Sequence, residues 1–458
     1  MSKKRIYLVI ESKKREMDSR IFFCILAAFN GYSAVLSTKT KLYSVLKNLK
    51  NGIFISKSIG PKNFKDFSQI INFGNSLCSW DEEGINFYNA EQLTDKKSRM
   101  DPKCLDLIEY FFLWGENHFN AVNQKFSKYS NKLVITGNPR IEILKKLSGF
   151  YNFKSEVIKK KYGNFILITT KFSRTNRKSK SDWVEDFTKA GFIQNEKEKE
   201  FQERTVNLEK KNLEIYLNTI NNLSKKISSK IIIRPHPAED PILYLKFFEN
   251  NSKVKVINDN DNTNSWIAAS NILISFNCVT SIEAYMLNKY SINYIPFRDE
   301  EYEFEIPKIC SHNIYEEKDL INFVLKNENT NLNPKKNDRS KLSHYIKNLT
   351  DNTSSIENIL EYINNIAIKG NKKEDINSNW YFNNILKIKY KTYALMAYIK
   401  SIYSKEFRKS YISLKKKREG FSRENVLTNF HLQKKYIDNV EDVKMSEIFP
   451  GVYCFEKK

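Results

Sequence analysis

The first 150 residues alternate between short apolar runs and longer amphipathic or polar stretches. After Arg5, residues 5–10 form a continuous apolar run, which is typical of a strand buried on both faces of a parallel sheet. Apolar positions over 17–29 recur with a helical period, and Gly31 follows as a stop signal. Further strands are predicted at 33–36, 52–56, 76–80, 111–114 and 132–136. This alternation is typical of a doubly wound α/β domain.

The same pattern then starts again. Residues 164–170 predict a strong strand, and the charged segment 171–214 predicts a loop followed by the start of a long helix. Later strands are predicted at 229–234, 253–257, 272–275 and 291–295, with an amphipathic helix over 280–288. We therefore expect two Rossmann-like domains, over 1–150 and 151–330. Ligands of such sheets bind at the carboxyl ends of the strands, and the cleft between two such domains is the expected site.

The composition changes from residue 331 onward. Asn and Lys dominate through Lys373, with helical patches such as 356–368. Residues 381–436 hold 14 Lys and Arg against three Glu, a net charge of +11, which is almost half of the +23 of the whole chain. We expect 331–458 to form a helical, basic C-terminal extension. Its helices either lie on an anionic membrane face near a lipid-linked acceptor or wrap the second domain with a solvated charged side.

Composition excludes several classes of protein. A hydrophobic content of 41% is too high for a disordered chain. The 13 glycines are so widely spaced that none can form the glycine fingerprints of dinucleotide enzymes, P-loop NTPases or protein kinases. The six scattered cysteines, and the lack of a signal-peptide core or a membrane span, predict a cytoplasmic protein with reduced thiols. Zinc spacings are absent, and Asp259-Asn260-Asp261 is a weak metal motif, so no metal is expected.

Three consecutive carboxylates follow the predicted strand 76–80. They are Asp81, Glu82 and Glu83, and Gly84 ends the run. Three adjacent carboxylates cannot all be buried and ionised, so one of them could have a raised pKa and act as a general base. The alternative is a solvated acidic turn that glycine closes.

A rigid histidine follows the predicted strand 229–234. In Arg234-Pro235-His236-Pro237 a proline on each side pre-sets the backbone, and no helix can run through this piece. A fixed imidazole at a strand end suits contact with a phosphate or a leaving group, with His236 as donor. The alternative is a structural turn.

Two further anion-binding candidates lie near ends of strands in the first domain. Asn138 and Arg140 follow the strand 132–136 and open a helix, where free amides and a guanidinium can bind phosphate or carboxylate. The alternative is an interdomain turn with Asn138 as the helix cap. Glu11 and Arg15 follow the first strand and could meet an anionic sugar, or could form a solvated turn.

The last group of candidates lies in the second domain. A strand ends at Ser275 and a helix begins near Thr280, where hydroxyls and amides can bind a phosphate. Glu283 either reaches a ribose hydroxyl or serves as a capping-box carboxylate. After the first strand of this domain come polar residues suited to a phosphate or carboxylate, although a surface charge run is also consistent with them. The donor-binding candidates of the two segments are Lys171, Ser173, Arg174, Ser275, Asn277, Thr280, Ser281 and Glu283.

The order of these motifs, over about residues 4–330, resembles bacterial surface-carbohydrate biosynthesis proteins with the GT-B glycosyltransferase fold. The R-x-H-P motif at Arg234–Pro237 is also similar to that of CDP-glycerol glycerophosphotransferases. Glu82-Glu83-Gly84 and His236-Pro237 look like the D/E-D/E-G and HP motifs of bacterial sialyltransferases, in which the carboxylate is the base and the histidine contacts the CMP phosphate. The third carboxylate, Asp81, departs from the pattern and leaves the identity of the base open.

The resemblance implies a metal-independent glycosyltransferase without a cofactor. The expected donor is a CMP-activated nonulosonic or ulosonic acid, and the expected acceptor is a surface glycan or a lipid-linked oligosaccharide. One of Asp81, Glu82 and Glu83 would activate the acceptor hydroxyl, and Arg234, His236 and Pro237 would contact the leaving phosphate. Arg15 and Arg140 would meet the donor carboxylate. The rivals are a glycerophosphotransferase, a UDP-sugar transferase or epimerase, and a non-catalytic RNA- or membrane-binding protein; nucleic acid is not an expected partner, because no nucleic-acid module is visible.

Overall fold

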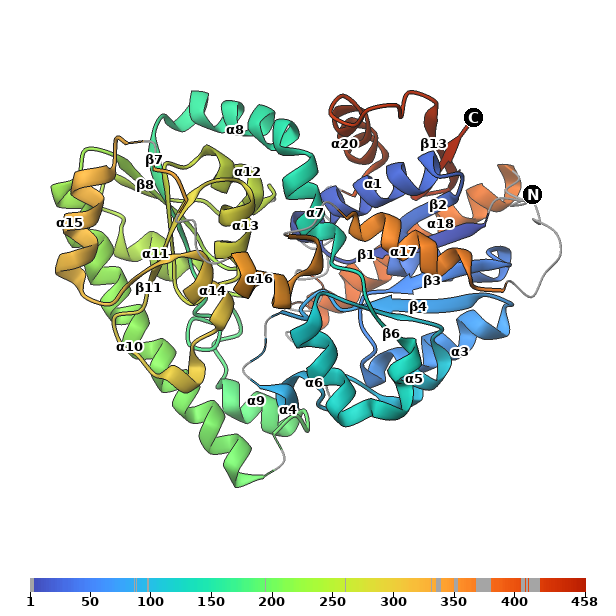
Figure 1. The fold of residues 1–458 in the computed structure, drawn as a ribbon, viewed down its shortest axis with the longest axis horizontal. Helices are drawn as coiled ribbons and strands as arrows, with labels where there is room; N and C mark the ends of the chain where they lie inside the picture. Colours follow the sequence, from blue (N-terminus) through green and yellow to red (C-terminus); the bar gives the residue numbers. More distant parts are fainter. Residues whose placement is uncertain are drawn as a thin grey trace. The chain divides into compact units, whose positions relative to one another are not determined.

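The chain forms two compact α/β units (Figure 1). Unit 1 comprises Met1–Gly84, Asn89–Leu147 and Ser343–Lys458, and unit 2 comprises Ile85–Tyr88 and Ser148–Leu342. This computed structural model describes residues 4–85, 87, 89–96, 99–193, 195–259, 261–330, 332–334, 339–349, 353–367, 380–404, 408, 411 and 421–458. The break after Leu147 lies close to the expected boundary at 150, and the chain then returns to unit 1 at Ser343.

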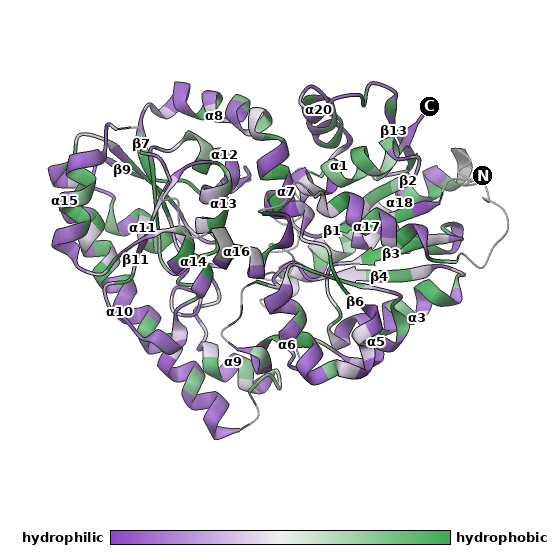
Figure 2. Cartoon of the chain, viewed as in Figure 1, coloured by the Kyte–Doolittle hydropathy of each residue, from purple (hydrophilic) through white to green (hydrophobic). Residues whose placement is uncertain are grey.

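The sheet of unit 1 has eight strands among the described residues, in the order β13-β14-β2-β1-β3-β4-β5-β6. Strands β1 to β6 run parallel, whereas β14 pairs antiparallel with both β2 and β13. β1 is buried along its whole length, which explains its continuous apolar run (Figure 2). The strands are β1 (Arg5–Ile10), β2 (Ser33–Thr38), β3 (Gly52–Ser56), β4 (Ser76–Trp80), β5 (Phe111–Leu113), β6 (Leu133–Ile135), β13 (Val443–Phe449) and β14 (Val452–Lys457).

Helices from both ends of the chain complete unit 1. They are α1 (Lys13–Phe29), α2 (Lys39–Ser44), α3 (Phe64–Asn72), α4 (Ala90–Leu93), α5 (Pro102–Leu107), α6 (Glu116–Phe126), α7 (Pro139–Lys146), α17 (Ser355–Asn364), α18 (Trp380–Tyr403) and α20 (Arg423–Lys434). Buried polar contacts fasten the late helices to the early ones. The Glu142 carboxylate of α7 accepts from the Ser355 hydroxyl at 2.6 Å and from the Ile356 N–H at 3.0 Å, which caps α17. Asn429 of α20 donates to the Asp18 carboxylate of α1 at 2.6 Å.

The C-terminal region differs from the helical extension that the sequence predicts. Its helices alternate with loops, and residues 443–457 form a hairpin whose second strand extends the sheet of unit 1 beside β2. The expectation of an all-helical region is therefore corrected. Pairing between residues so far apart in the chain leaves no local signal. Within the basic segment, residues 405–407, 409–410 and 412–420 lie outside the described residues.

Unit 2 has a six-stranded parallel sheet, in the order β12-β11-β10-β7-β8-β9. Its strands are β7 (Phe165–Thr169), β8 (Lys230–Arg234), β9 (Val254–Val256), β10 (Ile272–Ser275), β11 (Tyr290–Tyr294) and β12 (His312–Ile314). Its helices are α8 (Ser148–Tyr162), α9 (Trp183–Lys189), α10 (Glu196–Lys226), α11 (Pro241–Phe247), α12 (Thr263–Ala269), α13 (Thr280–Met286), α14 (Glu305–Cys310) and α15 (Glu317–Asn327), and α16 (Arg339–Tyr345) crosses the break between the units. Two apolar clusters, one on each face of the sheet, form the core.

Parallel pairing aligns the ends of the strands at the centre of unit 2. Thr169 at the end of β7 is in register with Ser275 on one side and with Arg234 on the other. The segments that follow these three strands therefore leave the sheet at the same edge, where a doubly wound sheet binds its ligands. They contain Lys171, His236 and Thr280, three of the predicted site residues.

Candidate functional site

The acidic turn of unit 1 is held by side chains on several elements. The Asp81 carboxylate accepts from the Glu83 N–H at 2.9 Å and from the Arg99 guanidinium at 2.9 Å. The Trp114 indole N–H donates to the Asp81 carbonyl oxygen, which fixes the backbone as it leaves β4. These contacts exclude the alternative of a freely solvated turn for Asp81, whose side chain is buried.

Glu82 forms a buried ion pair. Its carboxylate pairs with the Arg20 guanidinium of α1, and both side chains are buried. Arg20 also lies 4.1 Å above the Trp80 ring. Burial opposes ionisation of Glu82, but Arg20, Arg140 and Arg15 outweigh it and lower the pKa of this carboxyl. Glu82 is therefore ionised at neutral pH and is a weak base.

Glu83 reaches further into solvent and links two arginines. Its carboxylate lies 3.2 Å from Arg15 and 3.2 Å from Arg99, and its side chain is 47% exposed. Burial opposes the ionisation of Glu83, but Arg15, Arg99 and Arg140 together lower its pKa. Four arginines, two of which the sequence reasoning missed, thus surround three carboxylates.

Asp81 differs from its two neighbours in acid strength. Burial raises the pKa of this carboxyl, and Arg99 only partly offsets the effect. His118 faces Asp81 as a neutral side chain, because burial and Arg99 lower its pKa to about 3. The Trp114 backbone N–H donates to His118 Nδ1 at 3.4 Å, which assigns the ring proton to Nε2, the atom that lies 4.0 Å from Asp81. Of the three carboxyls, Asp81 is therefore the best suited to accept a proton.

Glycine is required at the end of the acidic turn. A Cβ atom on Gly84 would lie 2.2 Å from the His118 ring and 2.7 Å from the Trp114 indole. Gly84, the last residue of the acidic motif, thus lets His118 approach Asp81. Neither His118 nor Trp114 carried a sequence signal for this site.

The two predicted anion-binding turns of unit 1 have local structural roles as well. The Asn138 side chain accepts from the Arg140 N–H at 2.8 Å, so it caps α7 as the alternative predicted. The charge of Arg140 acts on Glu82 and Glu83. Glu11 forms an ion pair with Lys57 at 2.5 Å. Arg15 and Arg140 therefore belong to the same charged cluster, whereas Glu11 is paired outside it.

In unit 2, Arg234 is engaged within the domain. Its guanidinium donates to the Asp259 carboxylate at 2.7 Å and to the Asp261 carbonyl oxygen at 2.9 Å, and it lies 4.7 Å above the Trp266 ring. These contacts fix the turn that carries the weak metal motif, whose middle residue, Asn260, lies outside the described residues. Among the described residues, no group of three acidic, His or Cys side chains could hold a metal ion. A phosphate contact for Arg234 stays a prediction.

His236 is exposed, and its backbone contacts fix its orientation. The His236 N–H donates to the Thr170 hydroxyl at 3.3 Å, which ties the turn after β8 to the loop after β7. The Ala238 N–H donates to His236 Nδ1 at 3.2 Å. A neutral imidazole that accepts at Nδ1 carries its proton on Nε2, so His236 can donate from that atom. Pro237, which is also exposed, directs its carbonyl oxygen to the Lys178 amine.

A buried carboxylate that the sequence reasoning missed joins these two loops. Glu239 is 1% exposed and accepts from the Thr170 hydroxyl, the Phe172 N–H and the Tyr244 hydroxyl at 2.5–2.8 Å. Burial raises the pKa of Glu239 to about 7 against the effect of these three donors. Glu239 lies five residues after the end of β8, beyond the R-x-H-P motif, so its spacing gave no signal.

Lys171 provides an amine next to the end of β7. Its Nζ donates to the Asn277 carbonyl oxygen at 3.0 Å and lies 3.8 Å from the centre of the Phe304 ring. Burial and the charge of Arg174 lower the pKa of Lys171 to about 7. Arg174 itself pairs with the buried Glu209 of α10 at 2.5 Å, and Ser173 is half-buried in the same loop.

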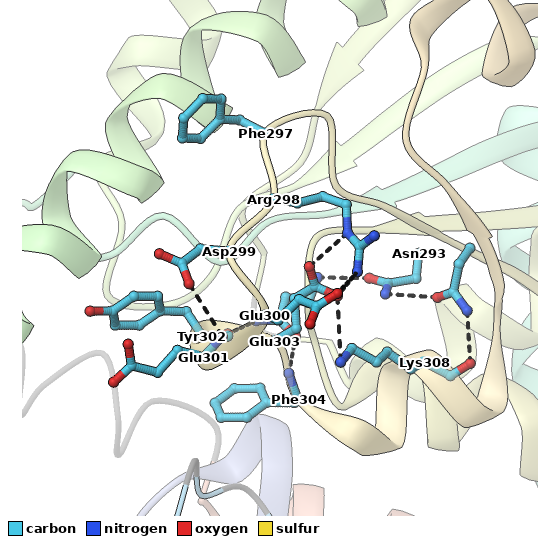
Figure 3. Close-up of polar contacts among 12 residues, drawn as sticks. Asn293, Phe297, Arg298, Asp299, Glu300, Glu301, Tyr302, Glu303, Phe304 and Lys308 are labelled. Atoms are coloured by element: carbon cyan, nitrogen blue, oxygen red, sulfur yellow. Dashed lines mark hydrogen bonds and ion pairs between the residues drawn. The ribbon is translucent and has the colours of Figure 1, made fainter.

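Asn277 adopts a left-handed backbone conformation, with φ of +43°, and organises the wall beside Lys171. Its side chain donates to the Tyr302 carbonyl oxygen at 2.6 Å and accepts from the Phe304 N–H at 2.7 Å. Its own N–H donates to the Asn293 side chain at 2.9 Å. In Figure 3, Arg298 and Lys308 reach toward Glu303 from opposite sides, at 2.9 Å and 3.6 Å. Ion pairs of Glu303 with Arg298 and with Lys308 of α14 thus hold the loop after β11.

The remaining candidates lie around the start of α13. The Thr280 hydroxyl lies 3.0 Å from that of Thr169, so the ends of β7 and β10 meet there. The Ser275 hydroxyl is fully buried and has no hydrogen-bond partner among the described residues. Ser281 donates to the Cys278 carbonyl oxygen at 2.9 Å within its own turn, and Glu283 is buried. Thr280 and Lys171 therefore share one strand edge with His236, while Ser281 serves its helix.

Comparisons with known proteins bear on the fold. No protein-family model and no curated protein matches the chain. The wall teichoic acid polymerase TagF is similar with a TM-score of 0.50 and 12% identity, over 80% of this chain and 89% of that chain. UDP-GlcNAc 2-epimerase from Methanocaldococcus jannaschii gives a TM-score of 0.47 and 13% identity, over 79% of this chain and 99% of that chain. The enzyme from Rickettsia bellii gives 0.47 and 11%, over 79% and 96%.

The chain has a GT-B-like fold with two Rossmann-like units, as predicted, and TagF matches this arrangement. Its structural neighbours with this fold are enzymes, a polymerase and epimerases. At such low identities the likeness concerns the fold alone.

Proposed function

We propose that the protein is a metal-independent glycosyltransferase that moves a sugar from a nucleotide-activated donor to a surface glycan or a lipid-linked oligosaccharide. The proposed donor is a CMP-activated nonulosonic or ulosonic acid, as the two short motifs at Glu82–Gly84 and His236–Pro237 suggest. In this proposal unit 2 binds the nucleotide and unit 1 supplies the base.

One observation carries the proposal. Three neighbouring strands of unit 2, β10, β7 and β8, end at one edge and present Thr280, Lys171 and His236 there. A hydroxyl, an amine and an imidazole N–H are donors suited to phosphate oxygens. The loops that carry Lys171 and His236 are joined through Thr170 and Glu239, so these donors are held in place before a ligand binds.

The leaving group departs as a nucleoside monophosphate. The bond between the anomeric carbon and the phosphate oxygen breaks, and its electron pair stays on that oxygen. His236 Nε2–H and the protonated Lys171 amine stabilise the new charge, as preorganised donors do in other transferases. This role requires no bound metal ion.

Asp81 is the proposed base. Its carboxylate takes the proton from the acceptor hydroxyl as that oxygen bonds to the anomeric carbon, and its raised pKa favours this step. Glu82 would hold Arg20 in place instead of accepting the proton. Arg15 and Arg140 are the proposed contacts of the donor carboxylate.

The test is donor cleavage in the presence of acceptor, followed as release of CMP. Asp81→Asn and His236→Ala are each expected to lose turnover strongly. Asp438→Asn and His344→Ala change exposed groups of the same types elsewhere and serve as matched controls. Full turnover in Asp81→Asn, Glu82→Ala and His236→Ala would refute the assignment.

A glycerophosphotransferase is the second candidate. The R-x-H-P motif at Arg234–Pro237 favours it, and TagF, which has been soaked with CDPG (CDP-glycerol), shares the fold. Thermal shift with CMP, CDP and UDP separates the candidates, because the ligand that binds the folded protein raises its melting temperature. Selective stabilisation by CMP supports the first proposal. A preference for CDP, together with cleavage of CDP-glycerol, would replace it with the second.

A further inference from the structure

The surface helix α18 has two apolar faces. One face is buried against the rest of unit 1: Leu386 is 3% exposed, the Tyr390 hydroxyl lies 2.6 Å from that of Ser44, and the Phe382 ring lies 5.9 Å from Phe449. These contacts fix the rotation of the helix about its axis. A helix on a soluble surface normally needs only this one apolar face.

The opposite face exposes an apolar stripe, which Thr392 interrupts between Ile388 and Leu395. Its side chains recur at spacings of three, four and seven, which places them on one side of a helix with 3.6 residues per turn. The stripe residues are Ile385, Ile388, Leu395, Met396, Ile399, Ile402 and Tyr403. Nine of the 18 large hydrophobic side chains that are exposed among the described residues lie on this helix of 24 residues.

Lysines border the stripe on both sides. Projected on the helix, Lys389 and Lys400 fall along one border, and Lys387 and Lys391 fall along the other. Tyr393 and Tyr398 stand near the same two borders, and both are exposed. Residues 380–403 contain no Asp or Glu.

We propose that α18 docks the protein on an anionic membrane, with the stripe in the interfacial layer and the lysines at the lipid headgroups. Apolar side chains between two rows of cations, with tyrosines at the borders, form the pattern of a helix that lies in a membrane interface. Each lysine adds attraction to an anionic surface. No helix among the described residues is long and apolar enough to cross a membrane, so α18 lies on the bilayer.

Charge favours a bilayer over a second copy of this chain. Two α18 helices packed stripe to stripe would bring lysines against lysines, with no acidic residue on either helix to balance them. Anionic headgroups supply the missing negative charge. A self-associating surface would need acidic positions at the borders of the stripe.

The first experiment measures co-sedimentation of the full-length protein with vesicles. One set is pure phosphatidylcholine, and the other contains about 30% phosphatidylglycerol. The wild type should bind the anionic vesicles and bind the neutral ones weakly. Ile388→Ser/Leu395→Ser/Ile399→Ser should bind the anionic vesicles at least about tenfold more weakly, because three apolar side chains no longer enter the bilayer.

The chain offers a matched control for this variant. Ile242, Leu245 and Phe247 of α11 are 43–52% exposed, against 43–65% for Ile388, Leu395 and Ile399 of α18. Their triple replacement by Ser should leave vesicle binding unchanged. No binding by the wild type, or equal losses in the two triple variants, would overturn the proposal.

Charge is tested separately. Lys389→Gln/Lys400→Gln should weaken binding to the phosphatidylglycerol vesicles about tenfold and should reduce its dependence on salt. Lys225→Gln/Lys226→Gln, at the end of α10, is the control and should bind as the wild type does. Unchanged binding in the α18 variant would contradict an anionic partner.

A labelled cysteine reports on the stripe directly. All six native cysteines are buried, so a dye on Leu395→Cys reports from α18. Its emission should shift to the blue on anionic vesicles. A blue shift that depends on protein concentration without vesicles, together with a dimer in sedimentation velocity, would replace the membrane with a second copy. Turnover on a soluble acceptor should survive in every α18 variant, so failure here is distinct from failure of the proposed transferase activity.

Discussion

The two units arrange charge at their strand ends in opposite ways. In unit 1 the acids Asp81, Glu82 and Glu83 are themselves at the site, and arginines pair with them there. In unit 2 the acids Glu209 and Glu239 are buried below the loops, where they hold Arg174 and the loop backbone. Acidic groups are therefore at the centre of one candidate site and only support the loops of the other.

Burial of the carboxyl groups has a different effect in each unit. In unit 1, burial beside arginines separates three adjacent carboxyls by acid strength, raising the pKa of Asp81 while that of Glu82 falls. In unit 2, buried carboxylates support the loops around Lys171 and His236: Glu239 bonds the Thr170 hydroxyl, which in turn accepts from the His236 N–H, and Glu209 pairs with Arg174. The first arrangement suits a proton acceptor, and the second suits an anionic ligand.

The largest expected effect tests whether Asp81, and not Glu82, is the base in unit 1. Asp81→Asn should lower turnover by about 10²–10⁴-fold, because the proton acceptor is lost. Glu82→Gln should cost less than Asp81→Asn, since Glu82 is a weaker base. CMP release from the donor measures both. Glu116→Gln is the control, since this exposed carboxylate pairs only with His344 in the described structure. A larger loss in Glu82→Gln would transfer the role of base to Glu82.

The next effect tests the donors of unit 2. His236→Ala should lower kcat by about 10²-fold, because one preorganised donor to the leaving phosphate is removed. His236→Gln keeps an N–H donor and should recover part of the loss, whereas a purely structural histidine would show no such recovery. The exposed His344→Ala should leave kcat unchanged.

Removing a support should reduce stability. Glu239→Ala leaves the donors of Thr170, Phe172 and Tyr244 without their acceptor, at a cost of about 3 kcal/mol in the free energy of unfolding. Urea unfolding measures the change, and the exposed Glu249→Ala is the control. If the free energy of unfolding falls by less than about 1 kcal/mol, the hydrogen bonds of Glu239 do not hold the two loops together.

The pH dependence of stability follows from the same residue. The pKa of Glu239 rises from 4.5 to about 7 on folding, so the folded state binds the extra proton between these values. The stabilisation from this proton is complete below about pH 4.5 and is lost as the pH rises through about 7. Glu239→Gln should remove this component from the pH profile of the urea midpoint. An unchanged profile would contradict the shifted pKa.

The smallest effect concerns Lys171. With a pKa of about 7, this amine is mostly protonated below pH 6 and mostly neutral above pH 8. A bound phosphate favours the protonated form of Lys171, so the affinity for CMP should fall several-fold as the pH rises across this range. Lys171→Arg stays charged and should remove the fall. Calorimetry on the two proteins at each pH cancels the titration of CMP itself, and parallel curves would exclude Lys171 as a phosphate contact.

Much of the fold could be predicted from local pattern. The strands Gly52–Ser56, Ser76–Trp80 and Ile272–Ser275 lie at the predicted positions, because buried parallel strands are continuous apolar runs with polar residues at their ends. The antiparallel hairpin of β13 and β14 could not, since only the distant β2 gives it a partner.

The positions of the candidate site residues were predictable where they follow strand ends, and their roles stay a prediction. The acidic turn and His236 were found because each directly follows a strand. Arg20, Arg99 and His118 were missed because helix and loop positions bring them to Asp81 only in the folded chain. Likewise, the engagement of Arg234 with Asp259 depends on a turn 25 residues away, and the choice among three adjacent carboxyls depends on burial.

The pairing of β14 with β2 has a consequence for biosynthesis. Unit 2 is almost continuous in sequence, so its residues leave the ribosome together and it can fold while synthesis proceeds. Unit 1 begins earlier but cannot complete its sheet until the last strand is made, and until then β2 has an unpaired edge. The first domain to be started is thus the last to be finished, which makes the nascent β2 edge the natural point for a chaperone to protect.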